Sequence, residues 1–122
     1  MTPFGEKIRE LRQARGITMK QMAADLGVSA PYLSALEHGH RGKPSWWLVQ
    51  RICSYFQIIW DEADELAALA KVSHPRIVID TAGLSPRATQ LANLLARDVA
   101  ALSEERIEEL LKLLDAKAPA KE

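Results

Sequence analysis

The side chains that could do chemistry gather around two glycines in one short segment: Glu37, His38, His40, Arg41 and Lys43. Histidine and glutamate can bind a metal, but a closed metal site needs about four ligands and this segment lacks the further ones. Arginine and lysine at close spacing instead suit the phosphates of a polyanion. We therefore interpret this segment as a basic loop that contacts phosphate, and we predict no metal site.

No other set of residues in the sequence suits catalysis. We find no nucleophile, base and acid that could be assembled, no paired carboxylates and no glycine-rich loop that could cradle a phosphate. Cys53 is the only cysteine, which excludes an internal disulfide and a multi-cysteine zinc site. It falls in an apolar helical pattern, so we expect it in the core. The sequence favours a binding protein that is not an enzyme and needs no cofactor.

Charge is divided unevenly along the chain. Residues 1–51 hold eight Lys or Arg against four Asp or Glu, whereas residues 52–122 hold eight against twelve. The net charge of zero therefore conceals an N-terminal part that is clearly positive. Because a polyanion responds to the local field and not to the sum, this part is the one suited to nucleic acid.

The size and composition suit one compact domain with an appendage, since 48% of the 122 residues are hydrophobic. The sequence has no apolar run long enough to span a membrane and no pattern of a secretory leader at Met1. A cytoplasmic location is the expectation that follows.

Apolar residues at helical spacing predict five short helices in residues 1–71. Gly16 and Gly27 are natural ends for the first two, while Thr18 and Ser29 are N-caps for the second and third. Pro31 falls in the first turn of the third helix, where a missing N–H costs nothing. The predicted inward-facing residues are Phe4, Ile8, Leu11, Ile17, Met22, Ala23, Leu26, Leu33, Leu36, Leu48, Ile52, Phe56, Ala63, Leu66 and Leu69.

Two adjacent tryptophans, Trp46 and Trp47, open the fourth predicted helix beside Leu48. We expect them to pack against neighbouring elements, as aromatic residues in such a position most often do. The alternatives are stacking on a sugar or a patch for a partner protein.

Residues 72–116 follow a different pattern. Alternating β-branched residues over Arg76–Asp80 predict a short strand, which would pair with the same strand of another subunit or with an edge of a partner protein. Ser85 with Pro86 opens a helix and Ser103 opens another, unless residues 86–116 form one long bent helix. Residues 117–122 are expected to be a frayed tail. The predicted fold class is therefore mainly all-α.

The segment "ITMKQMAADLGVSAPYLSALEHGHRGKPS" resembles the helix-turn-helix core of the phage-repressor and xenobiotic-response-element (XRE, Cro-type) family. The residues that match the family pattern are Ile17, Thr18, Met22, Ala23, Gly27, Val28, Ser29, Tyr32, Leu33, Ser34, Leu36, Glu37 and Gly39. The likeness covers about residues 4–70 and implies a five-helix repressor-like domain. In such domains the second helix of the motif enters the major groove of double-stranded DNA.

The resemblance assigns ten residues to the DNA interface. Those facing the groove would be Ala30, Pro31, Ser34, Ala35 and His38. The remaining candidates, several of them near phosphates, would be Thr18, Ser29, Tyr32, Arg41 and Lys43.

The identities of these residues suggest how DNA would be read. Neither Ala30 nor Pro31 can donate or accept a hydrogen bond through its side chain, so they would pack on thymine methyl groups. Specificity would then rest on Ser34, on His38, on the basic loop or on the shape of the DNA. Outlying candidates for phosphate contacts are Arg12, Arg15 and Lys20.

The function implied is a sequence-specific DNA-binding transcriptional regulator of the repressor kind, associated with the nucleoid. It would bind an inverted-repeat operator as a homodimer through residues 72–116. One alternative is an antitoxin-like regulator whose C-terminal segment binds a partner protein. A second alternative is a protein-interaction module that uses the helix-turn-helix scaffold without reading DNA.

Overall fold

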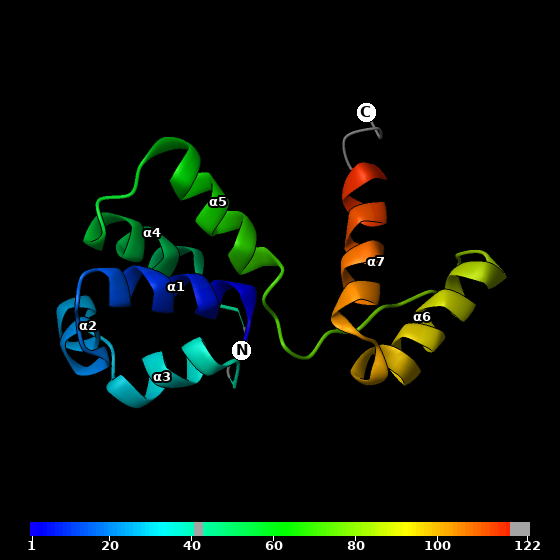
Figure 1. Cartoon of the computed structure of the whole chain (residues 1–122), viewed down its shortest axis with the longest axis horizontal. Helices are drawn as coiled ribbons and strands as arrows, with labels where there is room; N and C mark the ends of the chain where they lie inside the picture. Colours follow the sequence, from blue (N-terminus) through cyan, green and yellow to red (C-terminus); the bar gives the residue numbers. More distant parts are fainter. Residues whose placement is uncertain (41–42, 118–122) are drawn as a thin grey trace. The chain divides into compact units, whose positions relative to one another are not determined.

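The computed structural model describes residues 1–40 and 43–117 (Figure 1). The predicted phosphate contact Arg41 and most of the predicted tail, residues 118–122, lie outside the described residues. The chain forms two compact units, Met1–Ile77 and Val78–Glu122, here called unit 1 and unit 2.

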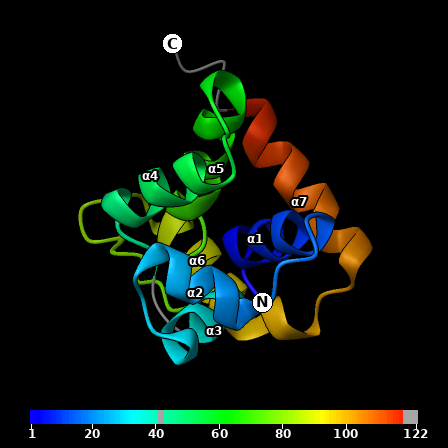
Figure 2. The same cartoon turned by 90° about the vertical axis from the view of Figure 1, so that its left-hand side faces the viewer.

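Unit 1 is built from five helices whose order matches the prediction. They are α1 (Pro3–Ala14), α2 (Met19–Leu26), α3 (Ala30–His38), α4 (Trp46–Tyr55) and α5 (Trp60–Lys71). Helix α1 packs against α3 and α5, α2 packs against α3 and α4, and α4 packs against α5 (Figure 2). This arrangement leaves α2 and α3 as neighbours joined by a tight turn.

The predicted boundary signals of α2 and α3 are confirmed. The hydroxyl of Thr18 accepts a hydrogen bond from the N–H of Gln21 at 3.0 Å, and that of Ser29 accepts one from the N–H of Tyr32 at 3.1 Å. Gly27 ends α2 with a φ of 76°, in the left-handed region that a residue with a Cβ rarely adopts. The turn between the two helices is therefore set by local sequence.

One hydrophobic core holds unit 1 together. Of the predicted inward-facing residues, Leu11, Ile17, Ala63 and Leu69 are only half-buried. The burial of Cys53 is confirmed, and it raises the pKa of the thiol. The fully buried apolar residues are Phe4, Ile8, Met22, Ala23, Leu26, Leu33, Leu36, Leu48, Val49, Ile52, Cys53, Phe56, Leu66 and Ala70.

A buried ion pair fixes α3 against α1. Glu37 has 2% of its side chain exposed, and its two carboxylate oxygens each accept a hydrogen bond from Arg12 at 3.2 Å. A third guanidinium N–H of Arg12 donates to the carbonyl of Ile17 at 3.1 Å. At the same contact Gly5 approaches the backbone of Glu37 so closely that a Cβ would overlap its carbonyl oxygen. The orientation of α3 is thus set by polar and steric contacts as well as by apolar packing.

Ser73 joins the two ends of unit 1. Its buried hydroxyl accepts a hydrogen bond from the N–H of Phe4 at 2.8 Å and donates one to the carbonyl of Leu69. One side chain thereby satisfies an N–H in the first turn of α1 and a carbonyl in the last turn of α5. Unit 1 therefore extends past the end of α5 and includes Ser73.

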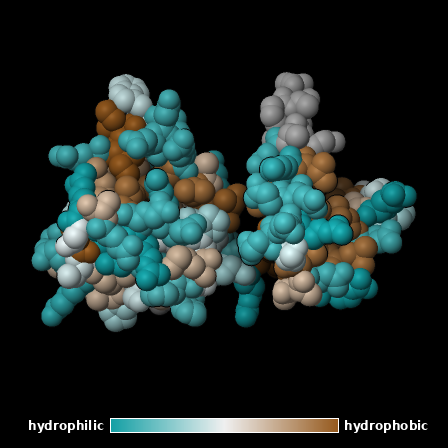
Figure 3. All heavy atoms as spheres, in the orientation of Figure 1, coloured by the Kyte–Doolittle hydropathy of each residue, from teal (hydrophilic) through white to brown (hydrophobic). Residues whose placement is uncertain are grey.

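Unit 2 consists of α6 (Pro86–Asp98), a short 3₁₀ turn (Val99–Ala101) and α7 (Glu104–Lys117). Ser85 caps α6 and Ser103 caps α7, as predicted, and the question left open for residues 86–116 is answered by two helices. No side chain of residues 78–115 is buried. Taken alone, this unit has no core, and hydrophobic side chains reach its surface (Figure 3).

The strand predicted over Arg76–Asp80 is wrong. Across residues 1–40 and 43–117 the structure contains helices and turns but no strand. A strand needs a neighbour for its backbone N–H and C=O groups, and the described chain offers none. The β-branched side chains of this segment are instead left in solvent, with Val78 90% exposed. None of the described helices combines the length and apolar character required to cross a bilayer.

Candidate nucleic-acid interface

Helix α3 has an inner face and an outer face. Leu33, Leu36 and Glu37 point into unit 1, whereas Pro31 and His38 are exposed. The other predicted groove residues, Ala30, Ser34 and Ala35, are half-buried, and so is the predicted phosphate contact Tyr32. Ala30 and Tyr32 pack against the edge of the core. The residues predicted to read DNA thus lie on one short, well-anchored helix.

His38 and Ser34 supply polar atoms on this helix. The Nδ1 of His38 lies 2.9 Å from the carbonyl oxygen of Ser34 and 3.5 Å from its hydroxyl. Because a carbonyl oxygen only accepts, this contact assigns the proton of a neutral ring to Nδ1 and leaves Nε2 as an acceptor. An acceptor on this helix suits the exocyclic amino group of cytosine or adenine.

Thr18 and Ser29 lie at the N-termini of the two motif helices. Both are exposed, and both hydroxyl oxygens already accept a capping hydrogen bond. A hydroxyl still has a donor to offer when its oxygen accepts one bond. The N-terminus of each helix also carries partial positive charge, so an anion is favoured at both positions.

Two of the outlying cation candidates are held by the protein itself. Arg12 is bound to Glu37, and Arg15 donates to the carbonyl of Phe56 at 2.8 Å while lying over its ring. Lys20 and Lys43 are exposed. Arg12 and Arg15 therefore have partners within the protein that could not be inferred from the sequence.

The expectation that Trp46 and Trp47 pack against neighbouring elements is wrong. Trp46 is 72% exposed and Trp47 is 59% exposed. The inward face of α4 is taken by Leu48, Val49 and Ile52, and the two preceding residues fall outside that face. The indole rings of Trp46 and Trp47 therefore lie largely in solvent at the N-terminus of α4.

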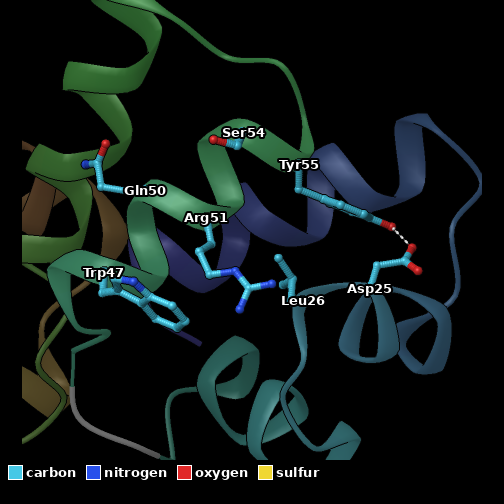
Figure 4. Close-up of a pocket in the computed structure, with 7 residues that line it drawn as sticks. All are labelled: Asp25, Leu26, Trp47, Gln50, Arg51, Ser54 and Tyr55. Carbon is cyan, nitrogen blue, oxygen red and sulfur yellow. Dashed lines mark hydrogen bonds between the residues drawn. The ribbon is translucent and has the colours of Figure 1, made fainter.

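A shallow cleft of about 430 Å³ lies between the end of α2 and α4 (Figure 4). At one end the hydroxyl of Tyr55 donates to the carboxylate of Asp25 at 2.6 Å, a bond that raises the pKa of Tyr55. At the other end the guanidinium of Arg51 lies over the ring of Trp47. Arg51 was not among the predicted site residues, although its spacing of four from Trp47 on a helix is a sequence signal for such a contact.

Within the described part of the chain, no three His, Cys, Asp or Glu side chains lie together in a group that could hold an ion. His38 and His40 stack on each other with ring centroids 6.4 Å apart, without a further ligand of that kind.

Comparison with known proteins agrees with this architecture. Residues 3–69 match the model of a family described as a helix-turn-helix domain. The uncharacterized HTH-type transcriptional regulator RghRB of Bacillus subtilis is 34% identical over 61 residues, which cover 50% of this chain and 44% of that protein. The HTH-type transcriptional repressor RghR of the same organism is 36% identical over 61 residues, covering 50% and 45%.

A third relative is the HTH-type transcriptional regulator DdrOP3 of Deinococcus deserti, 45% identical over 53 residues that cover 43% of this chain and 40% of that protein. The chain thus spans less than half the length of these relatives. No solved structure matches it significantly. The family model covers more than half of the chain and coincides with α1 to α5, so the chain belongs to the XRE-like helix-turn-helix family.

Proposed function

We propose that this protein is a sequence-specific DNA-binding transcriptional repressor that binds an inverted-repeat operator as a homodimer. The observation that carries the proposal is helix α3, which is capped by Ser29, fixed from behind by the pair of Glu37 and Arg12, and presents Ser34 and His38 on its outer side. A reading helix must be held rigidly, since a misplaced side chain loses its bond to a base edge.

Base recognition is proposed to combine two modes. Ala30 and Pro31 at the N-terminus of α3 would contact thymine methyl groups, while Ser34 and the Nε2 of His38 would hydrogen-bond to base edges. The hydroxyls of Thr18 and Ser29, with Tyr32, Ala35, Arg41 and Lys43, complete the proposed interface. Positions that no side chain reaches would be read through the shape of the DNA.

The homodimer is proposed to form through unit 2. Apolar side chains of α6, the 3₁₀ turn and α7 lie in solvent when the chain is alone: Leu91, Leu94, Val99, Leu110, Leu111, Leu113 and Leu114. Burying such residues against a second copy would remove apolar surface from water, at about 25 cal/mol for each Å². A dimer also supplies two reading helices one turn of DNA apart, which is what an inverted repeat requires.

The names of the relatives support the regulatory part of the proposal. One relative is called a transcriptional repressor and two are called transcriptional regulators. The matches cover 43–50% of this chain, and the family model ends at residue 69, within unit 1. The use of unit 2 in this chain therefore rests on its own exposed residues.

Selection of duplexes from a random library by the purified protein tests the whole proposal. We expect a palindromic sequence, whose spacing reports the distance between the two reading helices. Alanine variants of Ser34 and His38 should then change the preferred base at separate positions, by about 1–3 kcal/mol at each. A uniform loss on every sequence would contradict direct reading, and the absence of any selected duplex would contradict DNA binding itself.

A truncation tests the dimer. The cut must follow Ile77, the end of unit 1, and not Lys71, the end of α5, because Ser73 is part of unit 1. We expect the truncated chain to be a folded monomer with much weaker operator binding. If it stays dimeric, the role of unit 2 is refuted. If the full chain co-purifies with a different small protein in place of a second copy, the antitoxin-like alternative is favoured.

A further inference from the structure

Arg51 is a cation of α4 that lies outside the proposed reading helix. Its guanidinium carbon is 4.9 Å from the centroid of the Trp47 ring, and Figure 4 shows the side chain extending between Trp47 and Leu26. Among residues 1–40 and 43–117 no carboxylate forms an ion pair with it. A guanidinium stacked on an indole keeps its N–H edge available, so Arg51 presents oriented donors to an anion.

The position of this guanidinium relates it to the DNA-reading helix. A Cβ placed on Gly27 would lie 3.6 Å from one terminal nitrogen of Arg51 and 3.9 Å from the other. The guanidinium therefore covers the turn between α2 and α3, two residues before the N-cap Ser29. The first turn of α3 has N–H groups and partial positive charge of its own, and Arg51 adds a full charge at the same end.

We propose that Arg51 contacts a backbone phosphate of the bound duplex and that Trp47 holds its guanidinium in place. This inference rests on the proposed function, and it extends the interface from α3 to α4. Stacking on Trp47 restricts the long side chain before DNA arrives, which reduces the entropy lost on binding. The largely exposed indole of Trp46, at the same helix N-terminus, lies next to this contact in sequence.

The test measures affinity for the selected duplex between about 50 and 200 mM salt. In R51Q the slope of log affinity against log salt should fall by about 0.9 per bound subunit, and binding at about 0.1 M salt should weaken about eightfold per subunit. The loss should be equal on an unrelated duplex, because a phosphate contact carries no sequence information. R51K keeps the charge but not the planar stack, so it should retain the slope and lose part of the affinity.

Two further variants separate this role from a structural one. W47A keeps every charge but frees the guanidinium, and we expect weaker binding with a nearly unchanged slope. K71Q removes one exposed cation from the last turn of α5 and should leave both slope and affinity as in the wild type. The thermal unfolding of each variant is measured alongside.

The outcomes distinguish this inference from the proposed function. If the wild type binds duplex and R51Q keeps its slope, the phosphate contact is refuted while DNA binding stands. An unchanged slope with a much lower melting temperature would assign Arg51 to bracing the turn at Gly27, which also refutes it. If K71Q loses as much slope and affinity as R51Q, the effect comes from net charge and not from a contact of Arg51, which also refutes the proposal. A wild type that binds no duplex overturns both ideas.

Discussion

Glu37 offers the sharpest test of how unit 1 holds its reading helix. Replacement by alanine leaves the guanidinium of Arg12 without its partner, although 15% of that side chain stays exposed. Breaking a buried pair costs about 3–5 kcal/mol, and partial hydration of Arg12 lowers our expectation to about 2–3 kcal/mol. A unit of this size has a free energy of unfolding of only about 4–12 kcal/mol. The Glu37→Ala change should therefore lower the melting temperature by about 10–20 °C.

Urea unfolding of single and double variants measures the effect. Glu37→Gln keeps the shape and one acceptor, so it should cost less, about 1–2 kcal/mol. In the cycle with Arg12→Met, the double variant should be clearly more stable than the sum of the two single losses predicts. A loss below about 1 kcal/mol in Glu37→Ala, or additive losses in the cycle, would refute the view that this pair anchors α3.

Three further predictions concern other contacts. Gly5→Ala should destabilise unit 1 by about 1–3 kcal/mol in urea unfolding, because the added Cβ overlaps the backbone of Glu37. Ser73→Ala should cost about 1–3 kcal/mol in the same assay, because a buried N–H in α1 loses its acceptor. The raised pKa of Tyr55 means that its bond to Asp25 stabilises the fold below the ordinary tyrosine pKa of about 10, and this contribution is lost as pH rises through the folded pKa. Ultraviolet titration of the tyrosinate should therefore show late ionisation, and Tyr55→Phe should weaken the alkaline fall in stability.

Each of these has a contrary result. A Gly5→Ala protein as stable as the wild type would mean that α1 and α3 can separate at no cost. An unchanged Ser73→Ala protein would mean that water replaces the hydroxyl. Ionisation of Tyr55 at the ordinary tyrosine pKa would show that Asp25 does not hold its proton in solution.

Local signals made much of unit 1 predictable. Thr18, Ser29 and Gly27 act within four residues of their own position, so their roles as caps and turn could be inferred without knowledge of the fold. The helical spacing of apolar residues identified most of the core in the same way. The DNA-contact residues came from the resemblance, and their roles stay predictions.

The parts that could not be predicted depend on distant partners. Arg12 was a candidate phosphate contact until the fold brought it to Glu37, 25 residues away. The hydroxyl of Ser73 meets an N–H 69 residues away, beyond the expected end of the domain. The exposure of Trp46 and Trp47 could not be predicted, because it depends on which side of α4 faces the core.

The absence of a buried side chain in residues 78–115 has a consequence for how the protein would respond to its own abundance. If apolar burial in unit 2 comes only from a second copy, order in this segment depends on protein concentration while unit 1 folds at any dilution. Occupancy of a two-fold operator would then rise more steeply than in proportion to total protein. A repressor built this way would switch its target sharply around a threshold amount of itself.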